Sequence, residues 1–347
     1  MSREVKHFSL DRIDGTELRV IADAEWGVLP AVGIEEEVIR AYIRCGEWPH
    51  EWVTLFILQD FGPLVRQLES VAELPPGGEQ ALQRRPVVNV YDLADRAGCQ
   101  VFVNWQAMMR EGYWEEPAII RALLAHEHAH PLAECDTTAA SRKLRLEFAD
   151  NLGAVLAAPP GREADGGRID ELRRVLGSVA RKLCLESPRE VLANGLAIRC
   201  GFGESLLYLD KRNASNAEES LAGREQVKDE LAREAREGEI TPECGRALLL
   251  IGDLQAYLEL AIETASFIRE GRDSDAHEIE TVLTDRVLGR LTPGVDQAYA
   301  ALRDHYTALD AEMSPPRLAD WCLGAARILT RALAAEGVEV QYQVRLD

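Results

Sequence analysis

The run His126-Glu127-His128-Ala129-His130 has the form H-E-x-x-H, a pattern that brings its residues together only on a helix. Side chains four residues apart lie on one helical face, so His126 and His130 can point their imidazoles at a single ion. Such a pair is typical of zinc sites. Glu127 would project beside the ion, where its carboxylate can take a proton from water whose pKa the metal has lowered. The run therefore predicts a helix that carries two metal ligands and a catalytic base.

The flanking residues predict where this helix begins and ends. Pro117 suits the first turn of a helix, where its missing N–H is not needed. Pro131 follows the second histidine directly and should end or kink the helix. His128 lies about 200° around the helix from His126. We therefore expect His128 to be packed or at the surface rather than bound to the ion, and a role in proton transfer is the alternative.

Catalytic zinc usually takes three protein ligands, so the chain must supply another. Residues 141–158 are expected to form a helix, and its apolar or small face is interrupted by Glu147 and Asn151, one turn apart. A carboxylate on a buried face needs a compensating charge, which zinc would supply. Glu147 is thus the predicted third ligand, and Asn151 is predicted to orient a ligand or the water. The segment from Glu134 to Asp136, which includes Cys135, competes with Glu147 for this role.

These motifs together resemble the ImmA/IrrE zinc metallopeptidases. Residues 88–92 and 99–104 look like that family's short hairpin, which ends in an Asn and precedes the metal helix. Glu147 to Pro160 resembles its helix of pattern E-x-x-x-N-x-x-A followed by proline, whose Glu is the third ligand. Residues 183–201 look like its small helix-turn-helix tail. The resemblance covers about Val87 to Gly203, roughly a third of the chain.

The resemblance implies a zincin-like core, in which a small sheet lies beside the H-E-x-x-H helix and a single Zn²⁺ per chain is held by His126, His130 and Glu147. It also implies regulatory proteolysis of a specific protein such as a helix-turn-helix transcriptional repressor. In many zinc peptidases an edge strand beside the metal holds the substrate backbone extended. The strand expected at 99–103 is the candidate, with an ordinary sheet strand as the equal alternative. The substrate-strand residues would be Val101, Val103 and Asn104.

The charge and cysteine content limit the partners and the compartment. The chain of 347 residues has 59 acidic and 39 basic residues, a net charge of −20, which argues against direct binding to nucleic acid or an anionic membrane. A basic protein substrate suits it better. The seven cysteines form no C-x-x-C pair, which favours a reducing cytoplasm over a disulfide framework. No apolar signal or membrane-spanning stretch is recognisable, so export and insertion are not expected.

We expect an α+β fold that is predominantly helical and has four segments. Residues 1–74 are a mixed segment, residues 75–86 a linker rich in Pro and Gly, residues 87–203 the peptidase core, and residues 204–347 a helical C-terminal domain. In the first segment the patterns predict a strand at 17–21 and helices at 34–45 and 52–71. In the last they predict helices at 216–238, 244–272, 278–288, 295–309 and 318–337, then a strand at 338–344.

The predicted activity is that of a cytoplasmic zinc metalloendopeptidase in which Glu127 is the base. Two other functions fit the same residues. In one, the metal is structural and the helical C-terminal half acts as a regulatory or binding module without proteolysis. In the other, the site hydrolyses a small molecule, because H-E-x-x-H alone does not specify a peptide. The sequence predicts no oligomeric state.

Overall fold

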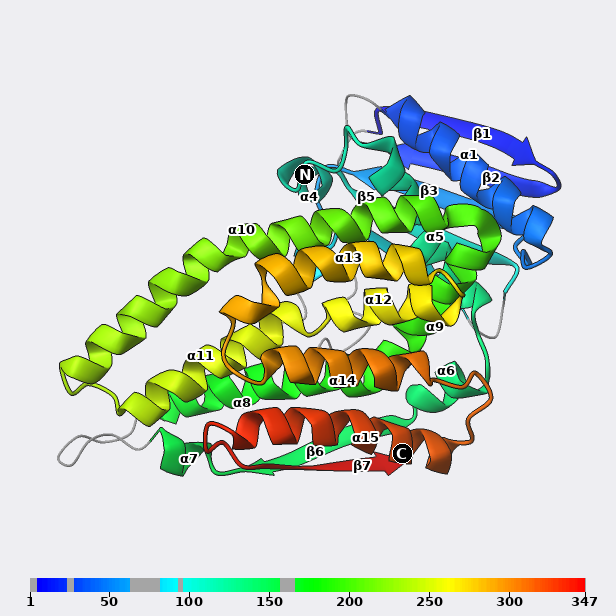
Figure 1. Ribbon diagram of the computed structural model, residues 1–347. Helices are drawn as coiled ribbons and strands as arrows, with labels where there is room; N and C mark the ends of the chain where they lie inside the picture. The colour runs from blue at the N-terminus through cyan, green and yellow to red at the C-terminus, as the bar shows by residue number, and fades with distance from the viewer. Residues whose placement is uncertain (1–4, 24–27, 63–81, 93–95, 157–165, 347) are drawn as a thin grey trace. The chain divides into compact units, whose positions relative to one another are not determined.

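A computed structural model describes residues 5–23, 28–62, 82–92, 96–156 and 166–346 (Figure 1). The protein is an α+β protein and about 65% helical, which confirms the coarse part of the expected fold class. It divides into two compact units, one of Met1–Ala133 with Leu196–Leu209 and the other of Glu134–Gly195 with Asp210–Asp347. These units do not follow the expected boundaries after residues 74, 86 and 203. The glycine- and proline-rich part of the expected linker lies outside the described residues.

The first unit contains a mixed sheet of five strands in the order β1-β2-β3-β5-β4. The strands are β1 (His7–Ile13), β2 (Thr16–Ala22), β3 (Trp52–Leu58), β4 (Val87–Tyr91) and β5 (Gly98–Asn104). β2, β3 and β5 are parallel to one another, whereas β1 and β4 run antiparallel to their neighbours. The expected pairing of 88–92 with 99–104 is confirmed over β4 and β5. The sheet thus joins strands from both sides of the expected linker.

β3 corrects the helix expected at 52–71 over its first seven residues. Its sequence WVTLFIL is almost continuously apolar, and its central residues Val53 and Leu55 are fully buried. A strand that lies between two parallel neighbours has no solvent-facing side, so it lacks the alternation that identifies a strand from sequence. Such a run cannot be told from a buried helix by periodicity alone.

Two helices pack against this sheet. α1 (Val28–Cys45) contacts β1 and β2, α5 (Pro117–Leu132) contacts β4, and the two helices contact each other (Figure 1). Tyr42 of α1 donates a hydrogen bond to the carbonyl of Ala125 of α5 at 2.7 Å. α5 begins with Pro117 in its first turn and ends one residue after Pro131, as expected. A short helix, α4 (Trp105–Arg110), follows β5.

The second unit is built mainly from helices, with one two-stranded sheet. α9, η2 and α10 contain residues of both units. The elements after α5 are α6 (Asp136–Ser141), β6 (Leu144–Asp150), α7 (Leu152–Val155), α8 (Gly166–Ala180), η1 (Arg181–Glu186), α9 (Ser187–Ala197), η2 (Ile198–Phe202), α10 (Gly203–Arg236), α11 (Pro242–Tyr257), α12 (Leu260–Arg269), α13 (Asp273–Arg286), η3 (Leu288–Arg290), α14 (Val295–Thr307), α15 (Pro315–Ala334) and β7 (Val340–Leu346). The helices predicted at 278–288, 295–309 and 318–337 and the final strand are confirmed as α13, α14, α15 and β7. The helix predicted at 216–238 corresponds to the C-terminal part of the longer α10, and 244–272 is two helices, α11 and α12. None of the described helices has the length and apolar character needed to cross a membrane.

β6 replaces the helix expected at 141–158. It pairs antiparallel with β7, and α15 lies against β7 (Figure 1). Its sequence LRLEFAD has its larger apolar residues, Leu144, Leu146 and Phe148, at every second position, as in a strand. The helix prediction is wrong because β6 is completed by a partner strand at the other end of the chain.

The prediction of a helix-turn-helix at the end of the core is also wrong, because the expected turn near Ser187 is helical. α8 continues through the π-helical segment η1 into α9, with helical backbone angles at Ser187. Pro188 follows and cannot donate to the preceding turn. The carbonyl of Leu183 instead accepts hydrogen bonds from Ser187 Oγ at 2.9 Å and from Tyr306 at 2.7 Å. The wide π turn and these two hydroxyls thus accommodate a proline that would otherwise break the helix.

A substitution of Gly98, at the start of β5, tests how closely the sheet is packed. A Cβ atom at this position would overlap the indole of Trp52 on β3. Gly98→Ala should therefore lower the free energy of unfolding by about 1–3 kcal/mol, because an overpacked core must shift its neighbours. Chemical denaturation of both proteins measures this difference.

Gly33 is the matched control for Gly98. It lies within α1, and an added Cβ would meet nothing within 4 Å. Gly33→Ala should be neutral or stabilising by up to about 1 kcal/mol through helix propensity. Equal effects of the two substitutions would contradict the close packing of Trp52 against Gly98.

Candidate metal centre

α5 holds two histidines at the spacing of ligands to one ion. Nε2 of His126 and Nε2 of His130 are 3.1 Å apart, and the ring centroids are 4.7 Å apart. Two nitrogens that share a tetrahedral zinc at its usual bond length lie about 3.4 Å apart. The two imidazoles therefore need to separate by only a few tenths of an ångström to hold one ion.

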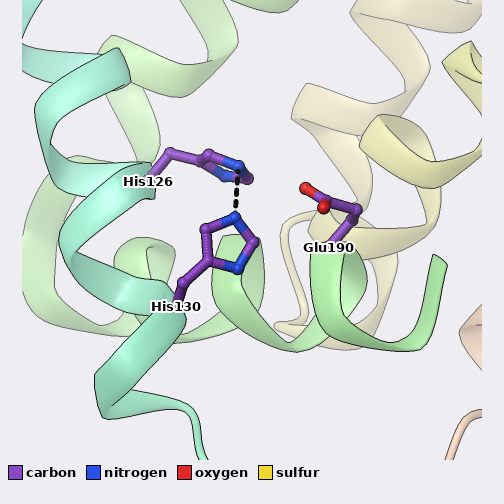
Figure 2. A group of neighbouring side chains, drawn as sticks. All are labelled: His126, His130 and Glu190. Carbon is purple, nitrogen blue, oxygen red and sulfur yellow. Dashed lines mark hydrogen bonds between the residues drawn. The ribbon is translucent and has the colours of Figure 1, made fainter. Parts of the chain in front are cut away.

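A carboxylate joins this pair. His126, His130 and Glu190 each offer one ligand atom, and these atoms all lie within 4.8 Å of one another (Figure 2). All three side chains are half-buried. Glu190 lies on α9. The cluster could bind a metal ion.

Among the described residues, the candidate metal-binding group does not include Glu147, the predicted third ligand. Its side chain on β6 is 54% exposed and forms an ion pair with Arg345 of β7 at 3.1 Å. The prediction rested on a helix with a buried face, and neither is present. Asn151 has a different role from the predicted one: its Nδ2 donates to the carbonyl of Gly337, and its Oδ1 accepts from the N–H of Glu339. These bonds fix the chain just before β7.

The competing segment from Glu134 to Asp136 has structural contacts. Arg142 binds both carboxylate oxygens of Glu134, at 2.7 and 2.6 Å. Cys135 is the N-cap residue of α6, and Asp136 is the first residue of that helix. Among the described residues this segment belongs to no group of potential metal ligands.

His128 is packed inside the protein, as expected from its position on the helix. Its side chain is fully buried, and its Nε2 lies 2.7 Å from Glu35 Oε1 of α1. Its Nδ1 lies 3.9 Å from the sulfur of Cys99 on β5. Burial alone would lower the pKa of His128, but the charge of Glu35 and the hydrogen bonds to Cys99 and Glu35 raise it to about 10. The contacts with Glu35 and Cys99 thus favour the protonated form of the His128 imidazole.

Glu35 was not recognised from the sequence, although a signal was present. Buried residues recur along α1 with the period of a helix, and Glu35 falls among them between Ile34 and Val38. A carboxylate at such a position requires a buried partner of opposite charge. His128, which does not join the His126 and His130 pair, meets that requirement.

Further aromatic contacts lie around His128. The ring of Trp48 is 5.2 Å from that of His128 and 4.9 Å from that of His50. His50 donates from Nδ1 to the carbonyl of Arg96 at 2.7 Å. Arg96 in turn donates to the carbonyl of Pro131 at 2.8 Å, near the end of α5. These contacts hold the C-terminal half of the metal helix in place.

Glu127 is hydrogen-bonded to a residue of β4. One of its carboxylate oxygens, Oε2, accepts from the main-chain N–H of Asn89 at 3.1 Å, and its main-chain carbonyl accepts from Asn89 Nδ2 at 3.0 Å. Asn89 is in the middle of β4. The predicted base is therefore held beside a strand, and it directly follows one of the histidines.

β5 is not an edge strand, which corrects the predicted substrate strand. It lies between β3 and β4, and both of its sides are paired. Val101, Val103 and Asn104 are at most 2% exposed. The side chain of Asn104 caps α4 through the N–H of Ala107 and donates to the carbonyl of Gln83. Among the strands of the described residues, β4 forms the edge of the sheet on this side.

Comparisons of the chain with protein-family models, curated proteins and solved structures gave no match. The geometry of the described residues is therefore the basis for assigning a function.

The burial of His50 predicts how stability depends on pH. Burial lowers the pKa of His50 from 6.5 to about 4, although its bond to the Arg96 carbonyl opposes this. Between these values the unfolded chain binds a proton that the folded protein does not, so His50 should destabilise the fold as the pH falls from about 6.5 to about 4. Urea denaturation at both ends of this window, on the wild type and His50→Gln, measures the effect. The stability of the variant should fall less, and equal losses would contradict the buried neutral imidazole.

Proposed function

We propose that this chain is a zinc-dependent metallopeptidase with a zincin-like site, in which Glu127 is the catalytic base. One observation carries the proposal. Glu127 directly follows a metal-binding histidine and is hydrogen-bonded to β4, the edge strand of the sheet. Peptide hydrolysis needs a base, a metal and a surface that holds an extended backbone. The first unit brings the base and such an edge together.

Zinc fits the donor set better than harder cations do. Two imidazoles and one carboxylate form the ligand set of many catalytic zinc sites and leave a fourth position for water. Calcium and magnesium prefer oxygen ligands alone. His126, His130 and Glu190 would hold the ion, with Glu190 in the place predicted for Glu147. When bound, zinc would lower the pKa of a water molecule and polarise the scissile carbonyl.

The chain's own residues then move the proton and hold the substrate. Glu127 accepts a proton from the water that attacks the carbonyl carbon, and it later gives this proton to the nitrogen of the leaving amine. β4 offers main-chain groups on its unpaired side, which would bind an extended segment largely independently of its sequence. In this role β4 takes the place predicted for β5.

A strand at the edge of the sheet beside Glu127 favours a peptide substrate over a small molecule. The net charge of −20 suits a basic protein, so a nucleic-acid-binding regulator such as a transcriptional repressor remains the proposed substrate class. A purely structural metal would not explain why Glu127 is held at the strand edge, since a structural site closes with four protein ligands.

Metal analysis of variants tests the ligand set. The wild type should bind about one zinc per chain, and His126→Ala and Glu190→Ala should each lose it or weaken binding strongly, because a ligand is missing. Glu147→Ala is the matched control, since it removes an exposed glutamate paired with Arg345. Loss of zinc from the Glu147 variant, with retention in the Glu190 variant, would restore the ligand predicted from sequence.

Glu127→Gln tests the base. The amide keeps the size of the side chain but cannot take the proton, so peptide hydrolysis should fall by about 10²–10⁴-fold or more while zinc is retained. A mixture of quenched fluorescent peptides provides the assay, and Glu147→Gln is the control. Full activity of Glu127→Gln would exclude this glutamate as the base.

A further inference from the structure

The hydrogen-bond register of β4 shows which of its main-chain groups are unpaired with β5. The N–H of Asn104 donates to the carbonyl of Pro86 at 2.8 Å, so these two residues form a hydrogen-bonded pair. In an antiparallel ladder such pairs alternate with pairs that are not bonded. The next hydrogen-bonded pairs are therefore Val88 with Phe102 and Val90 with Gln100. The main-chain groups of Val87, Asn89 and Tyr91 point toward the free edge.

Asn89 donates hydrogen bonds to Glu127 from both its outward N–H and its side chain. The N–H binds the carboxylate of Glu127, and Nδ2 binds the main-chain carbonyl of Glu127. Two bonds to one residue fix both the helix turn that carries the glutamate and the direction of its side chain. Asn89 Oδ1 is buried and has no hydrogen-bond partner among the described residues.

We propose that Asn89 is the positioning residue for Glu127, and that its N–H is shared between this base and the backbone of a bound peptide. The inference rests on the function proposed above. A strand added at β4 would pair with the outward groups, so a carbonyl of the peptide would take the N–H of Asn89. The carboxylate of Glu127 would then be released, while Nδ2 still holds the glutamate's main chain.

The two bonds can be removed one at a time. Asn89→Ala removes the side-chain bond and keeps the N–H, whereas Asn89→Pro removes both. Proline is tolerated on an edge strand where the N–H faces outward, as it does here. Tyr91→Pro is the control for proline at another outward position, and Val90→Ala is the control for side-chain loss because Val90 is exposed at 39%.

The measurement uses the full-length protein loaded with Co²⁺, whose visible spectrum reports the binding of a hydroxamate at the metal. A hydroxamate held at the metal would lie beside Glu127 and would donate a hydrogen bond to its carboxylate, so the affinity depends on where Glu127 is held. Acetohydroxamate should bind about tenfold or more weakly to Asn89→Ala than to the wild type, as is typical when a supporting residue of a metal site is lost. Val90→Ala should bind it as the wild type does. Cobalt content and melting temperature are measured for every variant.

A tetra-alanine hydroxamate tests the sharing of the N–H, because it adds a backbone that can pair with β4. Asn89→Pro should lose more affinity for this probe than for acetohydroxamate, whereas Asn89→Ala should lose the same for both. Equal affinities of the wild type and Asn89→Ala for acetohydroxamate would overturn the positioning role. Equal losses of Asn89→Pro for the two probes would overturn the sharing.

A different result would contradict the proposed peptidase function. A wild-type protein that binds no cobalt, or whose cobalt spectrum does not respond to either hydroxamate, would overturn the peptidase proposal and this inference together. If Asn89→Ala does not fold, Asn89→Asp supplies the same test, since it has nearly the same shape and lacks the Nδ2 donor. A response of Glu127→Gln that matches the wild type, while Asn89→Ala is weakened, would also overturn the positioning role.

Discussion

The buried pair of Glu35 and His128 determines how the metal helix is oriented. Both side chains are completely shielded from water, and they join α1 to α5 at 2.7 Å. Removing one partner of such a pair costs about 3–5 kcal/mol, because the other charge stays buried without compensation. With His128 fixed toward α1, the opposite side of the same helical turns carries His126 and His130. One histidine thus sets the rotation of the helix, and two others have the geometry of metal ligands.

The parts of this site that could be predicted from sequence are local. The H-E-x-x-H run, Pro117 and Pro131 act within one helix, so the spacing of residues is enough to predict its ends and the outward direction of His128. The pairing of β4 with β5 is also a contact between neighbouring segments. The sheet position of β5 is not local, because β3 comes from a segment more than 40 residues earlier. The local sequence of a strand does not reveal whether a distant segment pairs with its second side. An interior strand and an edge strand could therefore not be distinguished here.

The third ligand, a carboxylate, could not be predicted from sequence for the same reason. Glu147 belongs to a strand whose partner is at the C-terminal end of the chain, so the helical period inferred there had no physical basis. Glu190 follows Ser187 and Pro188, a pair that usually ends a helix, and this segment resembled the turn of a different motif. The π segment and the hydroxyl of Tyr306, from a helix far along the chain, keep the backbone helical through the proline. A ligand recruited by tertiary structure leaves no spacing signal.

The edge of β4 also has features that would limit its pairing with another copy of the chain. An unpaired strand invites pairing with another copy, and proteins limit the risk with short or obstructed edges. β4 is only five residues long, and the outward N–H at its centre is already bonded to a carboxylate. Another copy that approached this edge would have to displace a charged side chain as well as align with few donors. The residue proposed to cleave substrates would thereby also protect the sheet from aggregation.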